Sequence, residues 1–168
     1  MGEALVLLRY GFRHSFTELV AGSNFYPNSF VIDGVSCRSM EGFIQSLKCS
    51  DPNEQIRVCN MRGKRAKQFG RKTKNNSHYD FIKNGVFWNG VRYDRMSDEY
   101  QGLIRRAYRA MFEQCPKFRD ALADTGNKKL FHSIGKTNPR DTILSEKEFC
   151  SILTELRKEL YDKRSITR

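Results

Sequence analysis

The sequence predicts an α+β fold that is mainly helical and carries a small β-hairpin or sheet element. Two observations support this prediction. Apolar residues recur with helical spacing in three separate segments, and two short β-favouring runs flank an Asp-Gly turn. The chain has 168 residues, of which 39% are hydrophobic, so it can bury one core of ordinary size. We therefore expect residues 1–168 to form a single domain.

A β-hairpin is predicted at residues 30–37. Asp33-Gly34 separates two short β-favouring runs there, and Asp-Gly in that setting is the strongest short-range hairpin signal. Ser39 follows the hairpin and can cap a helix. The apolar stripe of this helix is formed by Met40, Phe43, Ile44 and Leu47.

The polar side of the same helix is the first candidate site. Glu41, Gln45 and Lys48 fall at positions i, i+4 and i+7, which places them on one face of a helix, away from the apolar stripe. We therefore expect these three side chains to point the same way.

The middle of the chain gives less regular signals. A second helix is expected to begin after Pro52 and to end near Gly70, and residues 71–76 have the composition of an exposed loop. Residues 77–96 combine aromatic and valine residues with two Asn-Gly turn signals. Strands or extended loops are therefore favoured over helix in that segment.

The last part of the chain is predicted to be helical. Ser97 can cap a long helix that runs to about Gln114, and a short helix should follow from Pro116. Residues 145–148 form a capping box that begins the last helix, whose apolar stripe consists of Phe149, Ile152, Leu153, Leu156 and Leu160. Residues 163–168 offer nothing to bury and are expected to fray.

Several function classes are excluded by what the sequence lacks. It contains no Gly-rich phosphate loop, G-x-S-x-G, H-E-x-x-H or EF-hand spacing, so we expect neither a metal site nor a bound cofactor. The three histidines, His14, His78 and His132, lie far apart, and each is expected to be structural or solvated. The apolar run at residues 4–8 is too short for a signal peptide or a membrane span, so a soluble cytoplasmic protein without a membrane partner is expected.

The cysteines point to the same compartment. They are odd in number, widely spaced and without a C-x-x-C pair: Cys37, Cys49, Cys59, Cys115 and Cys150. A disulfide framework is therefore not expected, and reduced thiols in a cytosol fit best.

The positive charge is concentrated in one segment. The formal net charge is +11, and every charged residue between Arg62 and Lys74 is basic. Such a run is either a solvated helix face or a surface that binds phosphates. Nucleic acid is then a candidate partner, through Arg62, Lys64, Arg65, Lys72 and Lys74.

Five short motifs occur in a fixed order along the chain. They are S-N-F-Y-P-N-S-F-V-I-D-G at 23–34, S-M-E at 39–41 with Gln45 and Lys48, A-K-x-x-G-R at 66–71, Trp88 with R-x-D-x-M at 92–96, and T-G at 125–126. In this order they resemble the NADAR (YbiA-like) family. The resemblance extends over roughly residues 23–160.

The resemblance implies both a fold and an activity. NADAR proteins are mainly helical with small strand elements and cleave N-glycosidic bonds. YbiA-like members act on phosphorylated ribosyl-pyrimidine metabolites, and others act on ADP-ribose attached to nucleobases. This chain is therefore expected to be an N-glycosidase that acts on a phosphorylated ribose or ADP-ribose conjugate. The implied substrate-binding residues are Asn24, Phe25, Tyr26, Gln45, Lys48, Lys67, Arg71 and Trp88.

The chemistry of these residues fits that expectation. Cleavage of an N-glycosidic bond develops positive charge on the ribose, and the Glu41 carboxylate can stabilise that cation or accept a proton from water. Without the resemblance, Glu41 would be interpreted as a first-turn glutamate that favours the helix dipole. Lys48, Lys67 and Arg71 can hold phosphates, and the alternative is that they are solvated charges.

The aromatic residues and the second carboxylate leave alternatives open. Phe25, Tyr26 and Trp88 can stack on a base or pack in the core. Asp141 is the candidate second catalytic carboxylate. In YbiA-like members a Trp-Gly pair comes shortly after this aspartate, whereas here Asp141 is followed by Thr142, Ile143 and Leu144. This departure indicates a divergent branch, for which a phage origin is one interpretation. The alternative function is a non-catalytic module that binds ADP-ribose, nucleotides or nucleic acid.

The capping box gives a first testable prediction. Ser145→Ala should lower the free energy of unfolding by roughly 1 kcal/mol, because the hydroxyl that accepts from an unpaired helix N–H is removed. Chemical denaturation of both proteins measures the difference. An unchanged midpoint would refute the cap assignment.

Overall fold

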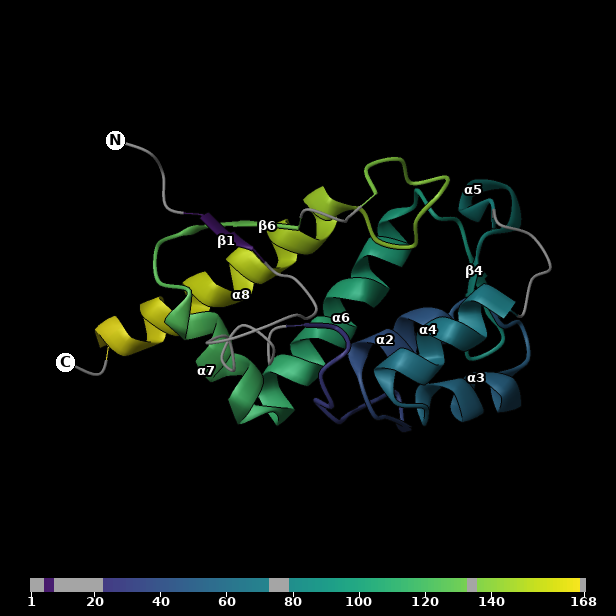
Figure 1. Ribbon diagram of the computed structural model, residues 1–168, viewed down its shortest axis with the longest axis horizontal. Coiled ribbons are helices and arrows are strands. Elements are labelled where there is room, and N and C mark those ends of the chain that lie inside the picture. The colour runs from purple at the N-terminus through teal and green to yellow at the C-terminus, as the bar shows by residue number, and fades with distance from the viewer. Residues whose placement is uncertain (1–4, 8–22, 73–78, 133–135, 167–168) are drawn as a thin grey trace.

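The computed structural model describes residues 5–7, 23–72, 79–132 and 136–166, and it confirms the predicted α+β class (Figure 1). The long helix α6 (Asp98–Gln114) runs through the middle of the molecule. Helices α2 (Met40–Ser46), α3 (Pro52–Cys59) and α4 (Gly63–Lys72) lie on one side of it, and α7 (Pro116–Asp124) and α8 (Glu146–Ile166) lie on the other.

Two antiparallel hairpins confirm the turn signals in the sequence. Strands β2 (Phe30–Ile32) and β3 (Val35–Cys37) are joined by Asp33 and Gly34, with φ of +47° and +79°. Strands β4 (Val86–Trp88) and β5 (Val91–Tyr93) are joined in the same way by Asn89 and Gly90. Both turns use the left-handed conformation that Gly, Asn and Asp tolerate best.

A third strand pair was not predicted from the sequence. Strand β1 (Leu5–Leu7) runs parallel to β6 (Lys129–Phe131), with Val6 opposite Leu130. Strand β1 lies near the start of the sequence and β6 lies between α7 and α8, so no local pattern predicts the pairing. It places the end of β6 beside α8 (Figure 1).

The predicted helix caps are all present. Ser39 Oγ accepts from the Gly42 N–H at 3.1 Å, and Ser97 caps α6 in the same way. At α8, Ser145 Oγ accepts from the Glu148 N–H at 3.3 Å while Glu148 Oε2 accepts from the Ser145 N–H at 2.7 Å, which completes the capping box. These bonds satisfy N–H groups that have no partner within their own helices.

Some of the helix boundaries predicted from the sequence were wrong. The single helix expected from Pro52 to Gly70 is divided into α3 and α4, and Arg71 is helical rather than part of a loop. Both helices pack on α2, so the chain turns between them. A Cβ on Gly42 would lie 2.9 Å from the Cys59 carbonyl oxygen, which shows how closely the end of α3 meets α2.

Two further boundaries differ from the prediction. A short helix α5 (Phe81–Asn84), capped by Asp80, occurs in the segment expected to be extended. Helix α8 continues to Ile166, whereas the sequence predicted fraying from Lys163. Lys74 and the rest of the predicted loop at 73–76 lie outside the described residues, as do His14 and His78.

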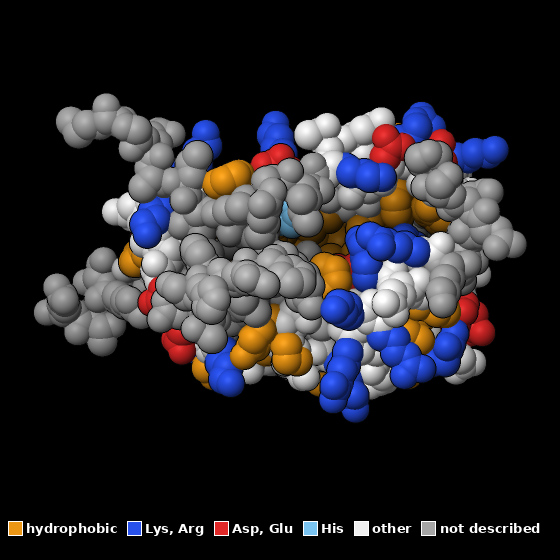
Figure 2. All heavy atoms as spheres, in the orientation of Figure 1, with side chains coloured by type: hydrophobic (Ala, Val, Ile, Leu, Met, Phe, Trp, Pro, Cys, Tyr) orange, Lys and Arg blue, Asp and Glu red, His pale blue; other side chains and the backbone are white. Residues whose placement is uncertain are grey.

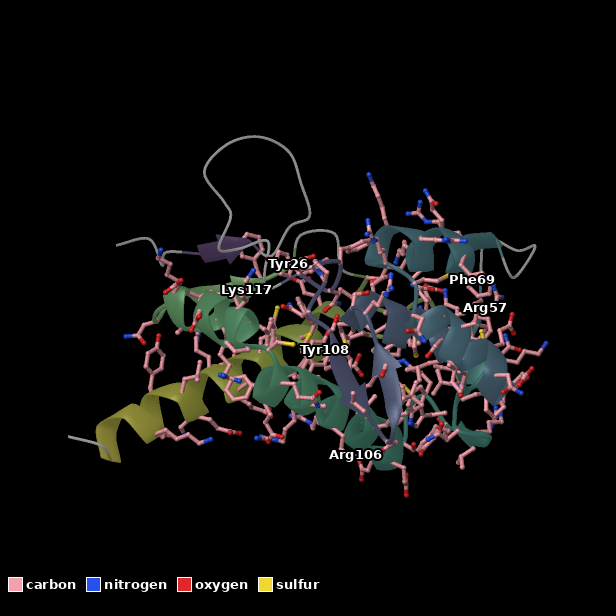
Figure 3. The ribbon with its side chains drawn as sticks, turned by 90° about the horizontal axis from the view of Figure 1, so that it is seen from below. Tyr26, Arg57, Phe69, Arg106, Tyr108 and Lys117 are labelled. Carbon is pink, nitrogen blue, oxygen red and sulfur yellow. The ribbon has the colours of Figure 1, made fainter. Side chains whose placement is uncertain are left out.

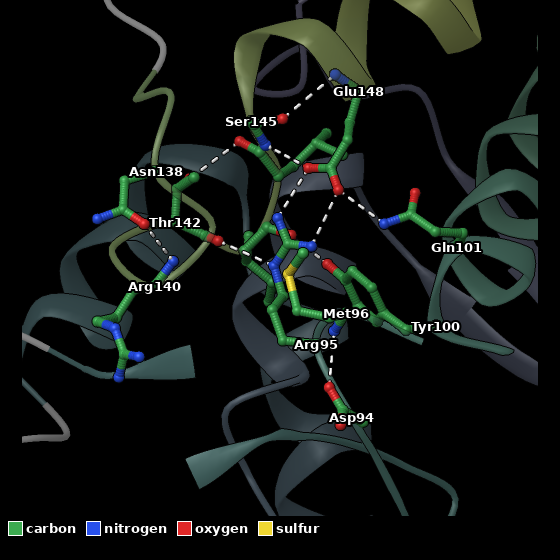
Figure 4. Close-up of polar contacts among 12 residues, drawn as sticks. Asp94, Arg95, Met96, Tyr100, Gln101, Asn138, Arg140, Thr142, Ser145 and Glu148 are labelled. Carbon is green, nitrogen blue, oxygen red and sulfur yellow. Dashed lines mark hydrogen bonds and ion pairs between the residues drawn. The ribbon is translucent and has the colours of Figure 1, made fainter. Parts of the chain in front are cut away.

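A buried ion pair joins the beginning of α6 to α8 (Figure 4). The Arg95 side chain is fully buried and donates to both carboxylate oxygens of Glu148, at 2.9 and 2.7 Å. Arg95 Nε also donates to the Thr142 carbonyl oxygen at 3.0 Å, and Gln101 donates to Glu148 at 2.7 Å. This network ties the loop before α8 to the N-terminal end of α6.

The network predicts a pH-dependent stability. Burial by itself raises the pKa of the Glu148 carboxyl. The hydrogen bonds from Arg95 and Ser145 together have the larger effect, and they lower this pKa to about 2. Because folding lowers this pKa, the ionised carboxylate stabilises the folded protein at pH values above 4.5, the ordinary pKa of the group. This stabilisation is lost as the pH falls from 4.5 toward 2. Glu148→Gln should therefore lower the free energy of unfolding by about 3 kcal/mol at pH 7, because a buried guanidinium loses its partner.

Denaturation at several pH values measures this effect. The gap between Glu148→Gln and the parent should narrow as the pH falls below about 4.5. The control is Glu155→Gln, because Glu155 pairs with Arg105 on the exposed surface and should contribute less than about 1 kcal/mol. Equal losses in the two variants would contradict the assignment.

Candidate functional site

The polar side of α2 buries a carboxylate. Glu41 is only 4% exposed, and its backbone N–H donates to the Asn24 carbonyl oxygen at 2.8 Å. One turn later, Gln45 Nε2 donates to Glu41 Oε1 at 2.7 Å. The predicted stripe therefore brings Glu41 and Gln45 into direct contact.

Helix α4 supplies the charge that faces this carboxylate. Lys67 Nζ lies 3.5 Å from Glu41 Oε1, and its side chain is 41% exposed. The two helices approach closely at Gly70, where an added Cβ would lie 1.8 Å from Gln45 Oε1. A side chain at position 70 would therefore displace the amide that holds Glu41.

Lys48, the third member of the stripe, lies in the same region. Its Nζ donates to the Gly70 carbonyl oxygen at 3.5 Å and lies 5.7 Å from the centre of the Phe81 ring. Burial lowers the pKa of Lys48 to about 8, and the charge of Lys67 lowers it further while Glu41 opposes the shift. The charge of Lys136 also lowers the pKa of Lys48. The positive charges of Lys48, Lys67 and Lys136 therefore influence one another in this region.

The segment 23–26 lies beside α2. Asn24 Oδ1 accepts from the Tyr108 hydroxyl at 2.7 Å, while the Asn24 backbone binds Glu41. The pKa of Tyr108 is well above its ordinary value because the phenol is buried, and the charge of Glu41 raises it further.

The backbone of Phe25 lies against Gly63. A Cβ added to Gly63 would lie 2.7 Å from the Phe25 Cα. Tyr26 is half-buried in the same loop.

Trp88 does not join this cluster. Its ring is 2% exposed and packs on Phe43, with ring centroids 5.0 Å apart, on the apolar side of α2. Its indole N–H donates to Asp33 Oδ2 at 2.8 Å. The structure therefore gives Trp88 a core position, and the expected stacking on a base does not fit its burial.

Two other predicted residues also lie apart from the cluster. Asp141 is exposed, and its Oδ2 accepts from Asn138 at 3.2 Å in the loop before α8. Arg71 is exposed on α4. Neither makes a described contact with Glu41, Gln45 or Lys67.

Sequence reasoning missed two residues on which the charge of Glu41 acts. Tyr108 was not among the predicted site residues, and His132 was expected to be structural or solvated. Burial lowers the pKa of His132 most, and the charges of Lys67 and Glu41 also act on it. No local pattern could identify either residue, because both reach the site through tertiary packing.

The surface over this region is hollowed. Figure 2 shows a recess with hydrophobic side chains inside it and Lys and Arg side chains beside it, where α4, α6 and the loop before α8 meet. Within the described residues, no group of three His, Cys, Asp or Glu side chains could hold a metal ion. None of the helices described there is long and apolar enough to cross a membrane.

Comparisons with other proteins place the chain among phage proteins. Residues 18–158 match the profile of the family described as bacteriophage protein GP30.3. A 17.1 kDa protein from the Gp30-rIII intergenic region of Enterobacteria phage T4 is 37% identical over 140 residues, covering 82% of this chain and 89% of that protein. The NMR structure of E. coli YbiA has a TM-score of 0.61 at 20% identity, covering 98% of this chain and 89% of that one. The YbiA-like fold and the link to bacteriophages are thus confirmed.

The contact at Gly70 yields a prediction. Gly70→Ala should lower the free energy of unfolding by about 1 kcal/mol, because the gain of roughly 0.5–1 kcal/mol from replacing a helical glycine is outweighed by a lost hydrogen bond to Glu41, worth about 1.5–3. The control is Gly102→Ala on α6, where an added Cβ meets nothing within 4 Å, so this substitution should stabilise the protein. Thermal unfolding of both variants measures the two effects. A gain at position 70 equal to that at position 102 would contradict the described packing.

Proposed function

Since this chain belongs to the bacteriophage GP30.3 protein family and has the fold of YbiA, we propose that it hydrolyses an N-glycosidic bond of a phosphorylated ribose or an ADP-ribose conjugate. The observation that carries the proposal is the buried Glu41 carboxylate, held by Gln45 and Lys67 in a region rich in lysine. Burying a carboxylate is costly, and such groups occur where their charge is used.

The proposed reaction uses Glu41 at the anomeric carbon. The bond between the ribose C1′ and the base nitrogen breaks, its electron pair leaves with the base, and positive charge develops on the ribose ring. The oxygen of a water molecule then bonds to C1′, and Glu41 accepts the proton that the water releases. The nearby carboxylate also stabilises the cation electrostatically.

The cations around Glu41 suit a phosphorylated substrate. Lys67 holds the carboxylate in place and remains 41% exposed, so its ammonium can also contact a ligand. The pKa of Lys48, lowered to about 8 by burial, still leaves most of the side chain charged at neutral pH. An ammonium group of this kind binds phosphate as a point charge.

Substrate identity requires a direct assay. The protein is incubated with ADP-ribosylated guanine DNA, ADP-ribosylated protein, NAD and ribosylaminopyrimidine phosphates, and released base or ribose phosphate is identified by mass spectrometry. Release from at least one of these compounds is expected. No release from any of them would remove support for the hydrolase.

Glu41 gives the sharpest test of the proposed mechanism. Glu41→Gln keeps the size of the side chain but removes its charge, so it should lower kcat by at least about 100-fold. KM should change far less, because stabilisation of a developing cation acts mainly in the transition state. The control is Glu99→Gln, since Glu99 also lies in a first helical turn but is exposed on α6. Full turnover in Glu41→Gln would end the catalytic proposal, and a collapse of its melting temperature would indicate a structural role.

The exposed face of α4 favours a second candidate function, the binding of nucleic acid. Lys64, Arg65 and Arg71 are exposed on this helix, whereas Lys67 turns toward Glu41. Arg57 of α3 lies over the Phe69 ring, with its guanidinium carbon 4.9 Å from the ring centroid. Both residues are labelled in Figure 3. A basic helix face with an adjacent aromatic residue suits a phosphate backbone.

Salt dependence tests this candidate. Neutralising Lys64, Arg65, Lys72 and Lys74 together should weaken binding evenly across sequences and reduce the slope of log K against log salt by about 3–4. Turnover of a free metabolite should be unaffected. If the parent protein shows no affinity for DNA or RNA at about 50 mM salt, the nucleic-acid surface is refuted.

A further inference from the structure

His132 follows strand β6 and reaches the Glu41 region through a chain of contacts. Its ring stands edge-on to Phe149 of α8, with centroids 5.4 Å apart and an interplanar angle of 85°. Phe149 packs in turn on Tyr108 at 6.0 Å, and the Tyr108 hydroxyl donates to Asn24. Phe149 and Tyr108 therefore connect the imidazole to the loop that binds Glu41.

One nitrogen of this imidazole lacks a partner. His132 Nδ1 is buried and makes no hydrogen bond with any described residue. The residue itself is fixed, because its backbone N–H donates to Glu146 Oε1 at 3.1 Å and its ring is held by Phe149. A buried polar atom without a partner is costly and commonly marks the place of a water molecule or a ligand.

Charged groups from three helices act on the imidazole. Burial is the largest cause that lowers the pKa of His132, and Lys67 of α4 lowers it further. Glu146 of α8 and Glu41 of α2 raise it but do not compensate. The ring is therefore neutral at pH 7, and a neutral imidazole accepts one hydrogen bond and donates another.

We propose that His132 is a substrate-contacting residue of the Glu41 site and that its free ring nitrogen binds a hydroxyl group of the substrate ribose. In this contact Nδ1 of the neutral imidazole accepts the hydrogen bond that the hydroxyl donates. That the ligand is a ribose rests on the proposed function. The unpartnered nitrogen and the ring contacts are structural observations that do not depend on it.

Titration calorimetry with ADP-ribose tests the inference on the full chain. His132→Phe keeps a flat ring against Phe149 but removes the nitrogen, so the dissociation constant should rise by roughly tenfold or more at pH 7.5. His132→Asn retains a polar group near the position of Nδ1 and should restore most of the affinity. The parent should bind more weakly as the pH falls through the lowered pKa of the ring, below the ordinary value of 6.5, because protonation of the ring removes its acceptor.

The asparagine variant also separates contact from packing. The Asn side chain does not titrate, so the affinity of His132→Asn should not show the loss that the parent shows at acidic pH. Equal affinity of the parent and His132→Phe would overturn the inference, as would failure of the parent to bind ADP-ribose or an affinity of the parent that does not change with pH. Turnover is measured separately: His132-dependent binding without any hydrolysis would count against the hydrolase and leave the inference standing.

Discussion

The burial of the Glu41 carboxylate between α2 and α4 is the constraint on which the site depends. A carboxylate removed from water loses several kcal/mol of solvation unless the protein supplies hydrogen bonds and an opposite charge. Gln45 supplies the hydrogen bond, and Lys67 supplies the charge. Gly70 allows α4, which carries Lys67, to approach α2 closely, and the absence of a Cβ at this position leaves room for the Gln45 amide. The helix predicted from Pro52 to Gly70 is divided into α3 and α4, and both of these helices pack on α2.

A second charged network joins α6, α8 and the loop between β6 and α8. Arg95 and Glu148 join the beginning of α6 to α8, and Arg95 also binds the loop that carries Lys136. Through α8 the same arrangement fixes Phe149, against which the His132 ring stands. The stability of the fold and the geometry of the site are therefore connected, although the two networks share no residue.

The sequence could predict the parts of this structure that local interactions determine. Capping serines set the helix starts, positive φ angles at Asp-Gly and Asn-Gly set the hairpin turns, and helical periodicity placed Glu41 and Gln45 on one face. It could not decide between site and core for Trp88, because that choice depends on Phe43 and Asp33 in distant segments.

The remaining parts of the site depend on tertiary packing. The parallel pairing of β1 with β6 joins segments that are far apart in the sequence, and the position of His132 depends on β6 and on α8. Neither hydrophobic pattern nor motif order carries such information. Motif order did indicate a YbiA-like fold, since it reflects the whole chain rather than single contacts.

A crystal structure of the intact protein with ADP-ribose would show whether the polar side of α2 faces the bound ligand. We expect the anomeric carbon of the terminal ribose to lie against the Glu41 carboxylate, with the phosphates near Lys48 and Lys67. A ligand bound elsewhere, out of contact with Glu41 and Lys67, would contradict the proposed site.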